Sequence, residues 1–99
     1  MLYAIISEDV ENSLPLRKGA RAAHLERVRT LQEQGRLVLA GPHPAIDSND
    51  PGDAGFSGSL IIAEFPDLAS AREWADADPY VSAGVYREVR VKPFKQVLP

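Results

Sequence analysis

The stretch PLRKGARAAHLERVRTLQEQG, from Pro15 to Gly35, predicts a single long helix around which the rest of the chain folds. Its apolar residues recur at the spacing of one helix face, while charged and amide side chains take the opposite side. Pro15 suits the first helical turn, and Gly35 suits the position just beyond the last one. The apolar face consists of Ala20, Leu25, Val28 and Leu31.

Three polar residues interrupt that apolar face. Because each residue turns a helix by about 100°, Arg17, Arg21 and His24 fall on one stripe, which continues into the apolar face. Packing against a sheet gives no reason for two guanidiniums and an imidazole at this place. These side chains therefore either extend over the apolar face into water at the sheet edge, or line a pocket.

Shorter segments on either side of this helix predict the remaining elements. Runs rich in apolar and β-branched residues predict strands, and VYREVRVK alternates in the way typical of a strand with one wet face. The order is β-α-β-β-α-β, which is the ferredoxin-like α+β arrangement: an antiparallel sheet with both helices on one face. The predicted strands are Leu2–Ser7, Arg36–Ala40, Ser59–Phe65 and Val85–Lys92, the second helix is Leu68–Ala77, and Pro79–Ala83 is a short helical turn.

One face of such a sheet carries no helices and needs a cover. Too many strand residues are apolar for all of them to point toward the helices. A second copy of the chain, placed sheet against sheet, is the most economical cover, so we expect a homodimer, or a higher homo-oligomer, with a barrel-like core. The residues behind this expectation are Leu2, Ile5, Leu39, Ile61 and Val89.

A long segment between the second and third strands, His43–Gly58, is rich in proline, glycine and aspartate and shows no periodicity. Gly41-Pro42, just before it, indicates an end or a bend of the preceding strand. A loop of this length in a small domain is either disordered or functional. Its glycines allow closure over a pocket, which stays an open alternative.

Composition narrows the possible functions. We expect the 99 residues to form one domain, and the net charge of −3 argues against nucleic acid as a partner. Because cysteine is absent, disulfides, thiol nucleophiles and thiolate metal sites are excluded. No apolar run approaches the roughly 20 residues that span a bilayer, and the N-terminus lacks the basic region and cleavage site of a signal peptide. We therefore expect a cytoplasmic protein with no membrane partner.

A histidine and an aspartate from the two helices are the leading candidates for chemistry. Histidine gains and loses a proton near neutral pH, and a carboxylate commonly fixes its tautomer. In this fold the end of the second helix approaches the first. His24 is therefore expected to meet Asp78, whose backbone is stiffened by Pro79, with Asp76 as the alternative. The plainer interpretation is that His24 is structural and that Asp78 only stops a helix.

No motif for a metal or a cofactor accompanies these residues. His24 and His43 lack the spacing of a ligand pair, and the glycines of GDAGFSGS do not lead from a strand into a helix as a phosphate-binding loop does. The chain also has no serine-centred nucleophile elbow. We therefore expect no metal and no cofactor.

Several short motifs, taken together and in order, resemble the YciI-like protein family. The resemblance runs along essentially the whole chain. It implies a ferredoxin-like fold, dimeric α+β barrels and an active site built on a His/Asp pair. The motifs are RKGARAAHL at 17–25, AGP at 40–42, SNDPG at 48–52, GFSGS at 55–59, WADADPY at 74–80 and GV at 84–85.

The family resemblance implies a site more readily than a reaction. Members with an assigned reaction are linked to lyase-type chemistry on small cyclic or aromatic compounds, such as loss of a halide from a chlorinated hydroxyquinol. We therefore hypothesise a cofactor-free lyase, isomerase or dehalogenase with a small-molecule substrate. The alternatives are a non-catalytic small-anion-binding or accessory module and, by analogy of fold alone, a cofactor-independent oxygenase. The implied site residues are His24 and Asp78 for catalysis, and Arg17, Arg21, Ser59 and Tyr80 for substrate binding.

Overall fold

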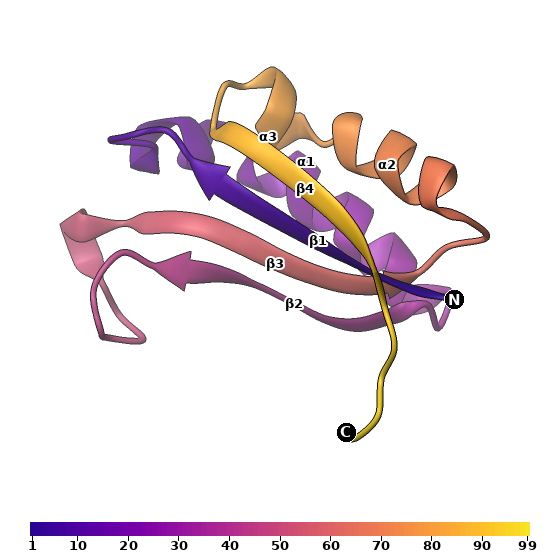
Figure 1. Cartoon of the computed structure of the whole chain (residues 1–99). Coiled ribbons are helices and arrows are strands. Elements are labelled where there is room, and N and C mark those ends of the chain that lie inside the picture. Colours follow the sequence, from indigo (N-terminus) through magenta and orange to yellow (C-terminus); the bar gives the residue numbers. More distant parts are fainter.

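The four strands form one antiparallel sheet, and the helices lie on one of its faces (Figure 1). The computed structural model describes all residues from 1 to 99, and the strand order across the sheet is β2-β3-β1-β4. This βαββαβ arrangement confirms the ferredoxin-like α+β fold predicted from the sequence. The strands are β1 (Leu2–Asp9), β2 (Leu37–Pro44), β3 (Phe56–Glu64) and β4 (Tyr86–Phe94). The helices are α1 (Leu14–Glu33), α2 (Leu68–Asp76) and α3 (Pro79–Ser82), with a 3₁₀ turn, η1 (Gly52–Ala54).

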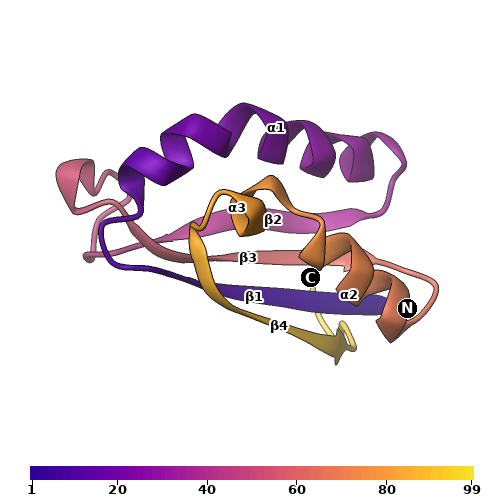
Figure 2. The same cartoon turned by 90° about the horizontal axis from the view of Figure 1, so that it is seen from above.

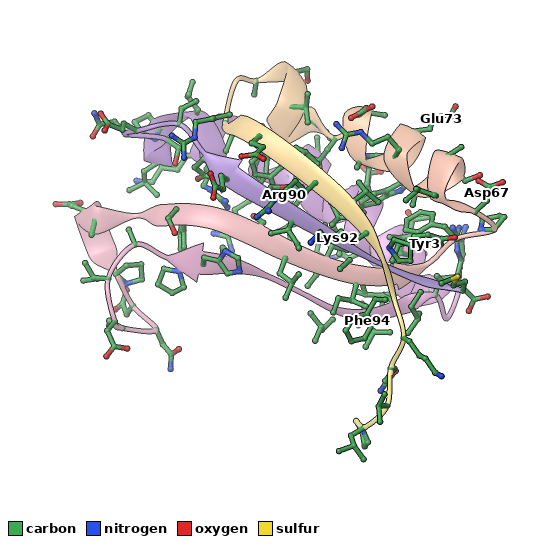
Figure 3. All side chains as sticks on the ribbon, in the orientation of Figure 1. Tyr3, Asp67, Glu73, Arg90, Lys92 and Phe94 are labelled. Atoms are coloured by element: carbon green, nitrogen blue, oxygen red, sulfur yellow. The ribbon has the colours of Figure 1, made fainter.

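The core lies between the sheet and the helices. β1 contributes Tyr3 and Ile5 to it, and α1 contributes Val28 and Leu31. Seen from above, α1 runs along the β2 side of the sheet, whereas α2 lies over β1 and β4 (Figure 2). Figure 3 shows Tyr3 on the helix side of the sheet and Phe94 on the opposite side. α1 and α2 therefore cover different strands of the sheet.

β2 and β3 are longer than the sequence predicted, and the loop between them is shorter. β2 continues through Pro42 to Pro44, and β3 begins at Phe56, so the predicted loop His43–Gly58 is wrong at both ends. The physical reason is that β2 is an edge strand, where the N–H groups that face outward need no partner and proline is tolerated. The remaining loop, residues 45–55, contains η1.

The outer ends of β1 and β4 also extend beyond their predicted bounds. β1 reaches Asp9, two residues beyond its predicted end at Ser7. β4 continues through Pro93 to Phe94, again on an edge strand.

No helix of the chain is both long enough and apolar enough to span a bilayer.

The face of the sheet away from the helices carries part of the apolar set on which the predicted dimer rests. Ile5 and Ile61 belong to the core on the helix side, and Val89 packs against it, so these three do not support a dimer. Leu2 and Leu39 lie on the open face, where Leu39 is 45% exposed. Two of the five residues named for the dimer therefore lie on the face that a second copy would cover.

Candidate active site

A cavity of about 220 Å³ lies between α1 and the β2–β3 side of the sheet. The polar stripe of α1 forms one of its walls, so these side chains line a pocket instead of extending past the sheet edge. The lining residues are Leu14, Arg17, Lys18, Arg21, His24, Leu25 and Val28 of α1, Ala40, Gly41 and Pro42 of β2, Phe56, Ser59 and Ile61 of β3, and Tyr80 of α3.

His24 and Asp78 are brought together at this cavity. The Nδ1 atom of His24 lies 2.9 Å from both carboxylate oxygens of Asp78. Asp78 is buried and caps the N-terminus of α3, where its Oδ1 accepts a hydrogen bond of 2.8 Å from the backbone N–H of Tyr80. Pro79 begins α3 at a position where a missing N–H costs little. The sequence DPY therefore fixes the carboxylate in front of the imidazole.

This pairing decides which nitrogen of His24 is available to a ligand. An ionised carboxylate only accepts hydrogen bonds, so Nδ1 carries the proton of the neutral ring and Nε2 keeps a lone pair. Nε2 has no hydrogen-bond partner in the protein, and the ring lines the cavity. A neutral His24 is thus arranged to accept a proton from a bound molecule.

Tyr80 supports one face of the His24 ring. The two rings stack with their centroids 4.0 Å apart and with 13° between their planes. Burial raises the pKa of Tyr80, and the positive charges of Arg17 and Arg21 oppose this rise. The phenol is therefore neutral at physiological pH and contributes a flat wall without a charge.

Arg17 is already committed to protein groups. Its Nε and Nη2 donate to the carboxylate of Asp9 at 2.6 and 3.0 Å, and Nη2 also donates to the Gly58 carbonyl oxygen and to Ser59 Oγ at 2.9 Å. Burial alone would lower the pKa of Arg17, but the hydrogen bonds and the charge of Asp9 outweigh it and raise the pKa. Arg17 therefore ties α1 to β1 and β3 through Nε and Nη2, while its Nη1 has no hydrogen-bond partner in the protein.

Asp9 is a site residue that sequence reasoning missed. Alternation along β1 places it on the same face of the sheet as Tyr3 and Ile5, and its side chain is buried. Its carboxylate also accepts a hydrogen bond of 2.6 Å from Ser13 Oγ. The signal that reveals Asp9 is the alternating pattern of the first strand, continued by two residues.

Two cations at the cavity wall remain free. Arg21 and Lys18 are exposed on α1, and neither side chain forms a hydrogen bond or an ion pair within the chain. No aspartate or glutamate is among the lining residues. The cavity therefore favours a ligand with negative charge.

Ser59 presents a hydrogen-bond donor to the cavity. Its Oγ accepts from Arg17 Nη2, and the hydroxyl of Tyr86 donates to it at 3.0 Å. Burial raises the pKa of Tyr86 to about 12, so this phenol keeps its proton. Because two donors already point at Oγ, the hydroxyl hydrogen of Ser59 is left for an acceptor oxygen in the cavity.

Two other candidate residues lie away from the cavity. Asp76 is exposed on α2 and pairs with Arg72 one turn earlier, so it is not the partner of His24. His43 is exposed on β2. No group of three or more histidine, aspartate or glutamate side chains is arranged to hold a metal ion.

Comparison with known proteins relates this site to a protein family. The model of the YCII-related domain matches residues 1–95. The chain belongs to the YCII-related domain family. Its motifs had indicated the same relationship, which is thereby confirmed. This family member is 60% identical over 97 residues to Protein YciI of Escherichia coli O6:H1 (strain CFT073), a match that covers 98% of this chain and 99% of that protein. It is 52% identical, with the same coverage, to an uncharacterized protein of Haemophilus influenzae (strain Rd).

A solved structure extends the comparison from the YCII-related family to an enzyme. The chain is similar to 5-chloro-2-hydroxyhydroquinone dehydrochlorinase from Burkholderia phenoliruptrix AC1100, in complex with 2,5-dihydroxybenzoquinone. The two are 26% identical with a TM-score of 0.83, and the match covers 96% of this chain and 94% of that one. A protein of this fold therefore binds a small oxygenated ring and catalyses a dehydrochlorination.

Proposed function

We propose that this chain is a cofactor-free enzyme that performs acid–base chemistry, of the lyase, isomerase or dehalogenase type, on a small anionic ring compound. One observation carries the proposal. The imidazole of His24, with its Nδ1 2.9 Å from both oxygens of the buried Asp78, lines a cavity of about 220 Å³. A histidine that is held by a carboxylate and has its second nitrogen free is the arrangement that proton transfer needs. The dehydrochlorinase of the same fold supports this assignment.

In the proposed reaction, Nε2 of His24 accepts a proton from the substrate. Asp78 orients the ring and stabilises the imidazolium that forms. The electron pair left on the substrate either expels a leaving group, such as chloride, or takes the proton back at another atom in an isomerisation. Proton transfer by a positioned histidine typically contributes about 10²–10⁴-fold to the rate.

The charge and shape of the cavity support an anionic ring as the substrate. Arg21 and Lys18 are cations without carboxylate partners, and Ser59 offers a donor hydrogen, so phenolate, enolate or quinone oxygens find partners here. Phe56 and Tyr80 add flat walls. The ligand of the dehydrochlorinase, 2,5-dihydroxybenzoquinone, has this chemistry.

The experiment compares the wild type with His24→Ala and with His43→Ala, a control at the exposed histidine. Chloride release and ultraviolet spectra follow the turnover of a panel of small ring compounds that includes 5-chloro-2-hydroxyhydroquinone. We expect the wild type and His43→Ala to turn over at least one compound, and His24→Ala to be slower by about 10²-fold or more. An active His24→Ala protein would remove the assignment. Saturable binding without turnover by the wild type would indicate a small-anion-binding module instead.

We also propose that a second copy of the chain covers the open face of the sheet. Leu2, Leu39 and Phe94 lie on that face, and Leu39 and Phe94 are 45% and 36% exposed. Covering such side chains removes apolar surface from water, at about 25 cal/mol per Å². A chain of 99 residues gains from this because its own core is small.

A further inference from the structure

Arg27 reaches from the helix that carries His24 to the segment that carries Asp78. It lies one turn after His24 on α1, and its Nη2 donates to the backbone carbonyl oxygen of Trp74 on α2 at 2.8 Å. Its guanidinium carbon lies 4.3 Å from the centroid of the Trp74 ring. Asp78 follows four residues later, and its own N–H donates to the Ala75 carbonyl oxygen at 3.2 Å. Arg27 therefore fastens the end of α2, and with it the start of the Asp78 turn, to α1.

The energetic cost of this placement points to a role beyond packing. The Nη1 atom of Arg27 is buried and has no hydrogen-bond partner, and it is the only such side-chain atom in the chain. A guanidinium stays charged, so a buried unpaired donor costs free energy that an apolar side chain would not. Burial lowers the pKa of Arg27, and the negative charge of Asp78 works against that lowering. The cation and the buried carboxylate therefore stabilise each other.

The other cations near the dyad serve different groups. Arg17 is paired with Asp9, and Arg21 is exposed at the cavity. When His24 is neutral, Asp78 is a buried anion that needs a compensating charge. Arg27 does not line the cavity, and the negative charge of Asp78 acts on its guanidinium.

We propose that Arg27 is a positioning residue of the His24–Asp78 pair. By holding the Trp74 carbonyl and lying on the Trp74 ring, it fixes the turn that carries Asp78 against His24. The catalytic consequence rests on the proposed function, whereas the effect on the pair is measurable without any substrate.

The test compares the wild type with Arg27→Gln and Arg27→Lys. Arg29→Gln is the matched control, because Arg29 is an exposed arginine of the same helix. Trp74 is the only tryptophan, so its fluorescence reports the contact with Arg27. The ¹⁵N resonances of the His24 ring report which nitrogen carries the proton. Chloride release from 5-chloro-2-hydroxyhydroquinone gives kcat and KM, and circular dichroism shows whether each variant is folded.

We expect Arg27→Gln to shift the Trp74 emission and to convert the His24 ring from one Nδ1-protonated form to a mixture of tautomers. The kcat should fall about tenfold or more with KM nearly unchanged, since the loss is one of orientation. Arg27→Lys keeps the charge but loses the planar fork, so it should lie between Arg27→Gln and the wild type. Arg29→Gln should match the wild type.

A folded Arg27→Gln protein with unchanged His24 resonances overturns the positioning role, whatever its activity. If Arg27→Gln does not fold, the ¹⁵N resonances of the His24 ring in Arg27→Lys decide the question. Failure of the proposed function gives a different result. In that case the wild type is inactive, while the His24 resonances still respond to substitution of Arg27.

Discussion

At the scale of single residues, the site divides its arginines between structure and binding. Arg17 donates to Asp9 and Ser59, while Arg21 lines the same cavity without a partner. The sequence places both on one stripe of α1 and leaves open which of them meets an anion. The difference arises from Asp9, whose buried carboxylate pairs with the arginine nearer the start of the helix.

Arg21→Gln is therefore expected to weaken the binding of 2,5-dihydroxybenzoquinone by about 10–100-fold, the worth of a hydrogen bond to a charged group. Its free energy of unfolding should stay near that of the wild type, because the Arg21 side chain is exposed.

Arg17→Met should instead cost about 3–5 kcal/mol of unfolding free energy, since it leaves the buried Asp9 without its cation. Optical titration and urea unfolding measure the two effects. Equal losses of stability in both variants would contradict this division.

Tyr86 is expected to make stability depend on pH in alkaline solution. Burial raises its pKa from 10.0 to about 12, so the folded state holds the proton more tightly than the unfolded chain. This stabilisation is complete below about pH 10 and is lost as the pH rises toward the folded pKa. Across that window the wild type should lose up to ~2 kcal/mol more unfolding free energy than Tyr86→Phe. Urea unfolding at several pH values between about 9 and 12 gives the free energy of unfolding of both proteins. If this free energy fell with pH by the same amount in the wild type and in Tyr86→Phe, the buried phenol would have no part in the pH dependence.

At the scale of elements, β1 and β3 approach so closely at Gly58 that no side chain fits. A Cβ there would overlap the backbone carbonyl oxygen of Ser7 and would lie 3.2 Å from His43 Nδ1. Gly58→Ala is expected to lower the free energy of unfolding by about 1–3 kcal/mol through overpacking. Gly41→Ala is the control, because no atom lies within 4 Å of a Cβ at that position. Denaturant midpoints of the two variants give the comparison, and a Gly58→Ala protein as stable as Gly41→Ala would refute the close approach.

The order of the elements follows from local patterns, and for this reason the sequence predicts it well. The helix expected at Pro15–Gly35 is observed at Leu14–Glu33, with differences only at its ends. The length of β2 depends instead on its place at the sheet edge, where Pro42 is tolerated. Edge position is a property of strand pairing, which no local pattern contains.

The candidate site is predictable to the extent that the fold alone brings its parts together. His24 and Asp78 meet because the ferredoxin-like fold places α3, which Asp78 caps, beside α1. The pairing of Arg17 with Asp9 and the contact of Arg27 with Trp74 depend on side-chain reach across elements. The helical spacing of α1 reveals its polar stripe but not the partners that each member finds.

At the scale of the whole molecule, the proposed dimer is tested by a charge on the open face. Leu39→Glu is expected to weaken self-association by at least about 100-fold. In the proposed symmetric dimer Leu39 would be buried in both copies, and burial of each leucine side chain is worth about 1.5–3 kcal/mol. Leu68→Glu on α2 is the matched control, since Leu39 and Leu68 are both 45% exposed in the monomer. Sedimentation equilibrium measures the association. A wild type that stays monomeric, or a Leu39→Glu protein that associates as tightly as Leu68→Glu, would count against the sheet-to-sheet dimer.

His24 is proposed to meet a small anionic ring inside the cavity, and one measurement tests this most directly. The ring ¹⁵N resonances of His24 and His43 are followed by NMR while 2,5-dihydroxybenzoquinone is added. We predict a saturable shift at Nε2 of His24, a proton that stays on Nδ1 because Asp78 holds it, and no response from the exposed His43. Saturable binding that leaves every His24 resonance unmoved would contradict the account.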